Sequence, residues 1–410
     1  MLQWASPNPM LTGAPDLRRL LSTLTGESVP DFVADFSHAP GTRVVFGSGE
    51  VERAGVFART LGSQRALVVT DRGIADAGHL DRVLQSLSAA GVEWSAFMGV
   101  VENPTTDTVD ACVATARENQ ADLLIGLGGG SSMDTAKGCN FLLTNGGKMS
   151  DYHGTGRATR PMLPLIAIPT TAGTGSECQS YALISDAKTH AKMACGDKKA
   201  AARIAILDPD LTATVPTGVA RVTGIDAIAH AVESAVSTRS TPVSTAYSRT
   251  AFSLLASVYL RVLNDPQDLE ARSAMLLGAA LAGVAIENSM LGAAHSSANP
   301  LTAHFGIVHG EAVGMMLPHV VRLNTTQPEA RAEYARLGAP LGIGGDVFAD
   351  FLTGILTKAA LPLATPAGTL AAEKIPQLAA EAAAQWTAQF NPARVDAAAF
   401  TELYGKVLPH

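Results

Sequence analysis

Charged side chains are scarce in this 410-residue chain: Asp, Glu, Lys and Arg make up 16% of it, while hydrophobic residues make up 47%. That balance is typical of a compact enzyme and excludes an intrinsically disordered protein. A basic surplus is absent too, because the formal net charge is -7. Nucleic-acid phosphates are bound by basic patches, so we expect no nucleic-acid partner. The length predicts two domains, each with a core of its own.

Long apolar runs and cysteine motifs are also missing. The longest stretch without charge or strong polarity, residues 274–286, is too short to span a bilayer and predicts a buried helix. The first residues lack the basic start and apolar core of a signal peptide. The four cysteines, Cys112, Cys139, Cys178 and Cys195, form neither a CxxC motif nor a disulfide-like framework. We therefore expect a cytoplasmic protein without a membrane partner.

Between about residues 41 and 207, short β-rich runs alternate with helical stretches. Runs such as RALVVTD and LPLIAIP are continuously apolar, as buried parallel strands are. This alternation predicts βαβ units and a parallel sheet. From about residue 208 the strand signals stop and alanine-rich helical segments follow. We predict an N-terminal extension at 1–40, an α/β domain at 41–207 and an all-α domain at 208–410.

One carboxylate and three imidazoles of the helical half make a complete ligand set for a borderline divalent metal such as Fe²⁺ or Zn²⁺. Asp226 and His230 are four residues apart, so a helix would place them on one face. His295 and His309 lie in a segment without any charged residue. The alternative is structural: with Thr223, Asp226 fits a capping box, and a lone buried histidine is more often a hydrogen-bonded core residue than a ligand.

Two glycine-rich loops follow predicted strands. GGGSSMD lies where a strand enters a helix, a place where backbone N–H groups can bind a pyrophosphate. It is not a GxGxxG fingerprint, so a tight turn without a ligand is the alternative. PTTAGTGSE offers hydroxyls and glycines suited to phosphate and ribose. Asp71, at the end of RALVVTD, could hold a ribose 2′-hydroxyl and so favour NAD over NADP, or it could only cap a turn or helix.

In combination these motifs resemble the iron-containing (group III) alcohol dehydrogenase family, which is related to glycerol dehydrogenase and dehydroquinate synthase. The resemblance covers nearly the whole chain after the extension, from RVVFGSGEVERAG through ENPTTDTVDA, GGGSSMDTAKG, IPTTAGTGSE, ILDPDL, TGIDAIAHAVES and HGEAVGMMLPHV to the closing NPARVDAAAFTELYGKVL. It implies that 41–207 binds the dinucleotide, that 208–410 binds metal and substrate, and that the metal lies in the cleft between them. A homodimer or higher homo-oligomer is implied as well.

The resemblance also assigns individual residues. The positions that match the family's metal ligands are Asp226, His230, His295 and His309. The positions that match its cofactor contacts are Asp71, Asn103, Gly129, Gly130, Ser131, Thr170, Thr171, Thr174 and Lys192.

One position departs from the family pattern. Four residues after the third ligand the family usually has a second histidine assigned to proton transfer, whereas this chain has Asn299. An asparagine cannot act as a general acid or base near neutral pH, although it can donate and accept hydrogen bonds. Asn299 could therefore orient substrate or water, aided by His304, or it could simply fill space with a satisfied hydrogen bond.

The resemblance implies a metal-dependent alcohol dehydrogenase that exchanges hydride between NAD(H) and a small alcohol, aldehyde or ketone. A lyase similar to dehydroquinate synthase is one alternative, but it would need several Lys and Arg near the metal, and residues 288–310 contain none. A reductase similar to maleylacetate reductase works without metal, so the intact ligand set argues against it. A non-catalytic binding or scaffold protein is disfavoured by the intact nucleotide motifs.

Overall fold

The structure is a computed structural model and describes residues 41–189, 191–368 and 370–408, all of them within one compact unit, Ala39–His410. The N-terminal extension predicted at 1–40 lies outside the described residues.

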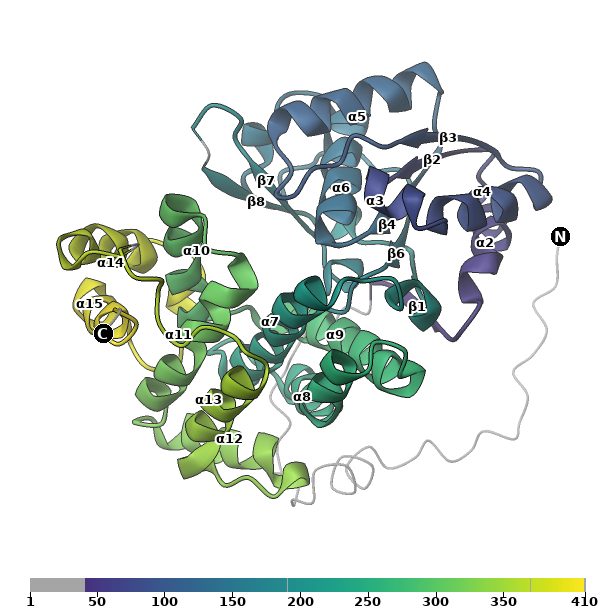
Figure 1. Cartoon of the computed structure of the whole chain (residues 1–410). Helices are drawn as coiled ribbons and strands as arrows, with labels where there is room; N and C mark the ends of the chain where they lie inside the picture. The colour runs from purple at the N-terminus through teal and green to yellow at the C-terminus, as the bar shows by residue number, and fades with distance from the viewer. Residues whose placement is uncertain (1–40, 190, 369, 409–410) are drawn as a thin grey trace, which may run out of the picture. The chain divides into compact units, whose positions relative to one another are not determined.

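A six-stranded, all-parallel sheet forms the first half of this unit, as the apolar runs predict (Figure 1). The strand order is β1-β9-β6-β4-β2-β3. The strands are β1 (Arg43–Phe46), β2 (Arg65–Val69), β3 (Glu93–Phe97), β4 (Leu123–Gly128), β6 (Leu165–Pro169) and β9 (Ile204–Leu207). The central strands β4 and β6 are buried along their whole length, which explains why their sequences lack the alternation of a half-exposed strand.

Helices cover both faces of this sheet, because alternate residues of its strands point to opposite sides. Leu67 and Leu124 belong to a core shared with α5 (Thr106–Glu118) and α6 (Gly130–Asn145). Their neighbours Val68 and Ile125 belong to a second core, built with α2 (Ala54–Thr60) and α4 (His79–Ala89). A short helix, α3 (Arg72–Asp76), follows β2. The three-layer α/β architecture follows directly from this division.

A second, three-stranded sheet was not predicted. Its order is β5-β8-β7, made of β5 (Gly154–Thr155), β7 (Tyr181–Ser185) and β8 (Lys192–Gly196). β7 and β8 are antiparallel and pair Tyr181 with Gly196 and Ser185 with Lys192. Both strands are only partly buried, so their sequences lack the continuous apolar run by which the main strands are recognised. This sheet carries Tyr181 and Lys192 to the site described below.

No strand follows Leu207 in the part of the chain that the structure describes, and helices make up the second half (Figure 1). α7 (Thr217–Val236) lies at its centre and packs against α8, α9 and α11. From Gly224 to Val236 every residue of α7 is buried. The other helices are α8 (Pro242–Asn264), α9 (Leu269–Ser289), α10 (Ala293–Phe305), α11 (His309–Asn324), α12 (Pro328–Gly338), α13 (Phe348–Lys358), α14 (Ile375–Ala383) and α15 (Ala397–Gly405).

The apolar stretch 274–286 lies within α9, which is longer than the stretch itself. With 21 residues and a mean hydropathy of 1.5 over its most apolar window, α9 has the length and composition of a membrane-spanning helix. Its neighbours are α7 and α8, Ala279 and Ala282 belong to the helical core, and Ala285 is fully buried as well. Burial among helices explains the same apolar composition, in agreement with the prediction of a buried helix.

Candidate metal and nucleotide site

One cavity of about 1000 Å³ lies between the sheet and the helical half. Its lining comes from the carboxyl ends of the parallel strands, where ligands of open α/β sheets bind, and from α7, α9 and α11. All nine predicted cofactor contacts and all four predicted metal ligands line this cavity. The structure thus brings thirteen residues from distant parts of the sequence to one space. Asn299, by contrast, is not among the lining residues.

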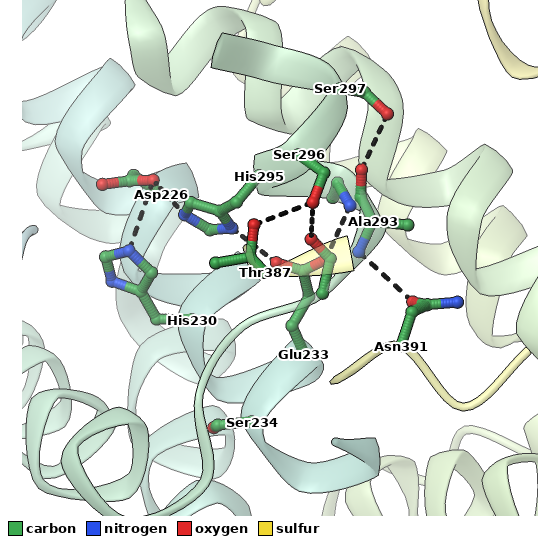
Figure 2. A network of polar contacts seen from close by, with 12 residues as sticks. Asp226, His230, Glu233, Ser234, Ala293, His295, Ser296, Ser297, Thr387 and Asn391 are labelled. Atoms are coloured by element: carbon green, nitrogen blue, oxygen red, sulfur yellow. Dashed lines mark hydrogen bonds and ion pairs between the residues drawn. The ribbon is translucent and has the colours of Figure 1, made fainter. Parts of the chain in front are cut away.

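Three of the four predicted metal ligands, the histidines, surround one carboxylate oxygen of the fourth, Asp226. Asp226 and His230 lie one turn apart on α7, while His295 comes from α10 and His309 begins α11. The Oδ1 atom of Asp226 is 3.3 Å from the Nε2 atom of His295, 3.6 Å from that of His230 and 4.0 Å from that of His309. Figure 2 shows Asp226, His230 and His295 facing one another, and the rings of the two histidines stack with their centroids 4.9 Å apart.

Buried atoms of this cluster have no hydrogen-bond partner among the described residues: Oδ1 of Asp226, Nε2 of His295 and Nδ1 of His230. Unpaired buried polar atoms are costly, and native proteins normally pair them with protein, water or an ion. Two buried imidazoles and a carboxylate within reach of one point, with a third imidazole beside them, fit a divalent cation that accepts nitrogen and oxygen.

The capping alternative for Asp226 is wrong. α7 begins at Thr217, so Asp226 lies in the third turn of the helix, far from the free N–H groups of its first turn. Thr223 does not cap a helix either, because its hydroxyl donates to the carbonyl of Val219 within α7. The Asp226 side chain is therefore available to the cluster.

The ionisation of the cluster suits metal binding. Burial alone would raise the pKa of Asp226, but His230, His295 and His309 hold it below its ordinary value. Burial lowers the pKa of His309, so its imidazole is neutral near pH 7. Burial would lower the pKa of His295 as well, yet the charges of Glu233 and Asp226 raise it to about 9. A metal bound to His295 at neutral pH must then displace a proton.

Glu233 is the functional candidate that our sequence analysis missed. Its Oε2 atom accepts a hydrogen bond from Nδ1 of His295 at 2.5 Å, and its Oε1 atom accepts one from the backbone N–H of Ala294 at 2.7 Å (Figure 2). Its position contains a signal that could have revealed it. Glu233 follows His230 by three residues and Asp226 by seven, so the helical period puts all three on one face of α7.

The two glycine loops lie against each other in the same cavity. Gly129 precedes α6 and, having no side chain, provides no side-chain cap for that helix. A Cβ atom on Gly130 would lie 2.8 Å from Cγ2 and 2.9 Å from Oγ1 of Thr174, so only glycine allows this approach. The first turn of α6 and the hydroxyl-bearing loop can thus face the same ligand, which suits a pyrophosphate.

Asp71 caps a helix, as one of its two interpretations holds, while its contact with a ribose stays a prediction. Its Oδ1 atom caps α3 by accepting a hydrogen bond from the N–H of Ile74 at 3.0 Å. The residue also lines the cavity, beside the glycine loop after β4. Capping uses one carboxylate oxygen, so the cap does not prevent the second oxygen from meeting a ribose.

Two aromatic rings from opposite halves of the cavity form a wall that the sequence analysis did not anticipate. Trp386 of the helical half stacks on Tyr181 of β7, with ring centroids 5.6 Å apart and planes inclined by 24°. Both residues line the cavity. Lys192 of β8 lines the same cavity, and its ammonium is 3.5 Å from the side-chain oxygen of Asn103.

Asn299 lies outside this arrangement. It follows His295 by one turn of α10, and its amide donates to the side-chain oxygen of Gln385 at 3.1 Å. His304, considered as its aid, is exposed and pairs with Glu381 at 2.7 Å. The structure thus favours the interpretation in which Asn299 fills space with a satisfied hydrogen bond.

We predict that Asn299→Ala and Asn299→His each change kcat/KM by less than about threefold, because neither the asparagine nor its partner touches the cavity. Loss of one partly buried hydrogen bond should instead lower stability by about 1 kcal/mol. Steady-state kinetics across pH, with thermal unfolding of the same samples, separate the two effects. A change in the pH profile of kcat would show instead that Asn299 takes part in proton transfer.

Comparison with known families agrees with this geometry. Residues 41–209 match the profile described as iron-containing alcohol dehydrogenase, and residues 220–408 match the C-terminal profile of the Fe-containing alcohol dehydrogenase family. The two matches together cover most of the chain.

Individual relatives are similar over most of their length. Alcohol dehydrogenase 4 of Schizosaccharomyces pombe is 36% identical over 73% of this chain and 71% of its own length. The NAD-dependent methanol dehydrogenase of Bacillus methanolicus is 34% identical over 77% of this chain and 81% of its own length.

Solved structures share the fold. A 1,3-propanediol oxidoreductase superposes with a TM-score of 0.88 at 28% identity, covering 91% of this chain and all of that one. A sulfoacetaldehyde reductase from Bifidobacterium kashiwanohense, solved with NAD⁺, gives a TM-score of 0.84 at 26% identity, covering 91% of this chain and 98% of that one.

Proposed function

The chain belongs to the iron-containing alcohol dehydrogenase family, and on this premise we propose that it catalyses reversible hydride transfer between NAD(H) and a small, uncharged alcohol or its aldehyde or ketone. The observation that carries this proposal is the shared cavity: the Asp226 cluster and the two glycine loops open into one space. A hydride can pass directly only if the cofactor and the substrate carbon meet, and a single cavity lets them meet.

Fe²⁺ is the metal that we propose, and Zn²⁺ would be accepted by the same donors. Asp226, His230, His295 and His309 would hold it. When bound, the ion supplies a Lewis acid that lowers the pKa of an alcohol or polarises a carbonyl. The protein's own contribution is to hold four donors in place before the ion arrives.

The dinucleotide would lie along the line from Asp71 to the metal cluster. We assign the ribose next to the adenine to Asp71, and the pyrophosphate to the loops that meet at Gly130 and Thr174. Lys192 lies farther along the cavity wall, where the charge of Asp226 acts on it. This layout supports a nucleotide domain at 41–207 and a metal and substrate domain at 208–410, divided after the last strand.

The helical half contributes several apolar side chains to the cavity wall, which argues for an uncharged substrate. Ile286, Met290, Leu291, Val308 and Trp386 line it. Among the described residues of the lining, Lys192 is the only Lys or Arg. A substrate with a phosphate and a carboxylate would need several such cations, so the lining disfavours the lyase alternative.

A screen tests the proposed function. The purified protein, loaded with Fe²⁺ or Zn²⁺, is assayed for NADH formation with primary, secondary and charged alcohols and for NADH consumption with the matching carbonyl compounds. We expect turnover of small uncharged alcohols and little turnover of phosphorylated or dicarboxylic ones. If no alcohol or carbonyl compound is turned over by metal-loaded protein with intact NAD binding, the proposal fails.

We predict that NAD is preferred over NADP by at least about tenfold in kcat/KM. A 2′-phosphate near Asp71 would place like charges a few ångströms apart, which costs on the order of 1–4 kcal/mol depending on exposure. Asp71→Ser should reduce the preference while leaving kcat with NAD nearly unchanged, because the serine can still cap α3. The matched control is Asp76→Ser at the end of α3, which does not line the cavity. Equal efficiency of the parent with both cofactors would show that Asp71 does not face the ribose.

A homodimer and a cytoplasmic location are further proposals. Among the described residues β1 pairs only with β9, and its side chains Val44 and Phe46 are 40% and 42% exposed. An exposed apolar edge strand favours association with a second chain. Light scattering after size exclusion would test this, and a monomer would refute it.

The four cysteines are buried and form no disulfide bond, which supports a reducing compartment. Localisation of a tagged chain would check this proposal.

A further inference from the structure

The helix that carries His295 has no cap of its own. α10 begins at Ala293 after Gly292, which has no side chain to accept from the free N–H groups of the first turn. Two residues from elsewhere take over this role: Oδ1 of Asn391 accepts from the N–H of Ala293 at 3.3 Å, and Oε1 of Glu233 accepts from that of Ala294 at 2.7 Å (Figure 2). The start of α10 is thus fastened to α7 by Glu233.

The approach leaves almost no room for a side chain at position 292. A Cβ atom there would lie 2.9 Å from Oδ1 of Asn391 and 3.1 Å from Oε1 of Glu233. The Glu233 side chain is only 3% exposed, so it has no freedom to move away into solvent. A negative charge near a helix N-terminus is also electrostatically favourable.

The second carboxylate oxygen of Glu233 acts on the imidazole itself. An ionised carboxylate only accepts hydrogen bonds, so Nδ1 of His295 must donate in the 2.5 Å contact. The ring is thereby turned with Nε2 toward Asp226, at 3.3 Å from its Oδ1 atom. With the Nδ1 proton held, the Nε2 lone pair becomes the coordinating one when the ring is neutral.

We propose that Glu233 is a positioning residue for the metal site: one oxygen sets the orientation and tautomer of the His295 ring, and the other sets the place of the helix that carries it. This inference rests on the proposed function, because it concerns the same metal cluster. It adds a residue that need not touch the metal or the substrate. One face of α7 then supplies two ligands, Asp226 and His230, and also Glu233, which positions the third ligand, His295.

The test is Glu233→Gln, which keeps the shape of the side chain but replaces one acceptor oxygen with an N–H donor. The amide has only one acceptor oxygen, so it cannot accept from both Ala294 and His295. At one of the two contacts the amide NH2 group would then face another N–H group, and that hydrogen bond is lost. We expect the affinity for Zn²⁺ or Co²⁺, measured by competition with a chelator, to fall by about 10- to 100-fold. Gly292→Ala, whose Cβ would press on the same carboxylate, should weaken binding in the same direction with the carboxylate retained.

Glu333→Gln is the matched control. Glu333 is also buried in the helical half, but its carboxylate pairs with Arg249 at 2.6 Å instead of with a cluster residue. Its loss should lower the melting temperature and leave the metal affinity within about twofold of the parent. A general loss of stability would therefore affect both variants, whereas loss of positioning affects the metal affinity of Glu233→Gln only.

A second measurement needs no metal. In metal-free protein with ¹⁵N-labelled histidine, the Nδ1–H proton of His295 should give a slowly exchanging, far-downfield signal in the parent and in Glu333→Gln. In Glu233→Gln this signal should be lost or move upfield, because a neutral amide oxygen is a weaker acceptor than a carboxylate. The proposal is overturned if Glu233→Gln binds metal as tightly as the parent, or if its Nδ1–H signal is unchanged. A parent that binds no metal would overturn the proposed function, and the positioning role with it.

Discussion

Alanine at Asp226 or at His230 should leave the purified protein without stoichiometric metal and reduce alcohol oxidation by at least about a thousandfold. A Lewis acid at the reacting oxygen contributes several kcal/mol to transition-state stabilisation, and each 1.4 kcal/mol corresponds to a factor of ten in rate. Both side chains lie on one face of α7, and the Oδ1 atom of Asp226 is the point to which the other donors converge. Removing Asp226 also removes the only negative charge among the four proposed donors.

Elemental analysis and kcat/KM on the same preparations provide the measurement. His319→Ala is the matched control, because His319 belongs to α11 like His309 but does not line the cavity. It should retain one metal per chain and parental activity. Retention of a full metal complement by both the Asp226 and the His230 variants would show that these residues are not ligands.

Glu177→Gln should stabilise the protein at pH 8 by on the order of 3 kcal/mol. Glu177 is 1% exposed, and its Oε1 atom has no hydrogen-bond partner among the described residues. Burial raises its pKa to about 7 from an ordinary value of 4.5, although a backbone hydrogen bond and Lys137 act in the opposite direction. Each pH unit between the folded and the unfolded pKa corresponds to about 1.4 kcal/mol.

The sign follows from which state keeps the proton. Between about pH 4.5 and pH 7 the unfolded chain ionises Glu177 while the folded chain keeps it protonated, so the free energy of unfolding falls as the pH rises. Above pH 7 the loss is complete. A glutamine does not titrate, so the gain of the variant should be full at pH 8 and should lack this component below pH 4.5.

Urea unfolding of parent and variant at several pH values measures this difference. Glu381→Gln serves as control, since Glu381 is a half-exposed surface carboxylate paired with His304. If the difference between Glu177→Gln and the parent does not change between pH 4.5 and pH 8, Glu177 is ionised in the folded protein throughout.

The sequence predicted those features of the fold and the site whose pattern lies within one short segment of the chain. The strands of the main sheet that lie within RALVVTD and LPLIAIP are buried on both faces, so burial alone made them recognisable. The partly exposed β7 and β8 were missed for the opposite reason. Asp226 and His230 could be paired by helical spacing because both lie on α7, whereas the placement of His295 and His309 beside them came from the family resemblance.

What stayed out of reach were contacts between residues far apart in the chain. Tyr181 and Trp386 are separated by 205 positions, and nothing in either segment indicates that their rings stack. Asn299 looked important because of what it replaces, but its actual partner is Gln385, on the segment after α14. Glu233 differs from these cases, since its spacing on α7 was visible and was overlooked.

The continuous burial of α7 makes the metal cluster sensitive to chain length as well as to residue identity. Inserting or deleting one residue between Asp226 and Glu233 would turn the remainder of the helix by about 100°, because an α-helix completes a turn in 3.6 residues. On an exposed helix such a change is tolerated, because the rotated side chains still face solvent. Here the residues from Gly224 to Val236 are enclosed on all sides, so the turn would drive apolar side chains into the ligand face. The number of residues in this stretch of α7 is therefore fixed. Substitutions can be accepted along it, but insertions and deletions cannot.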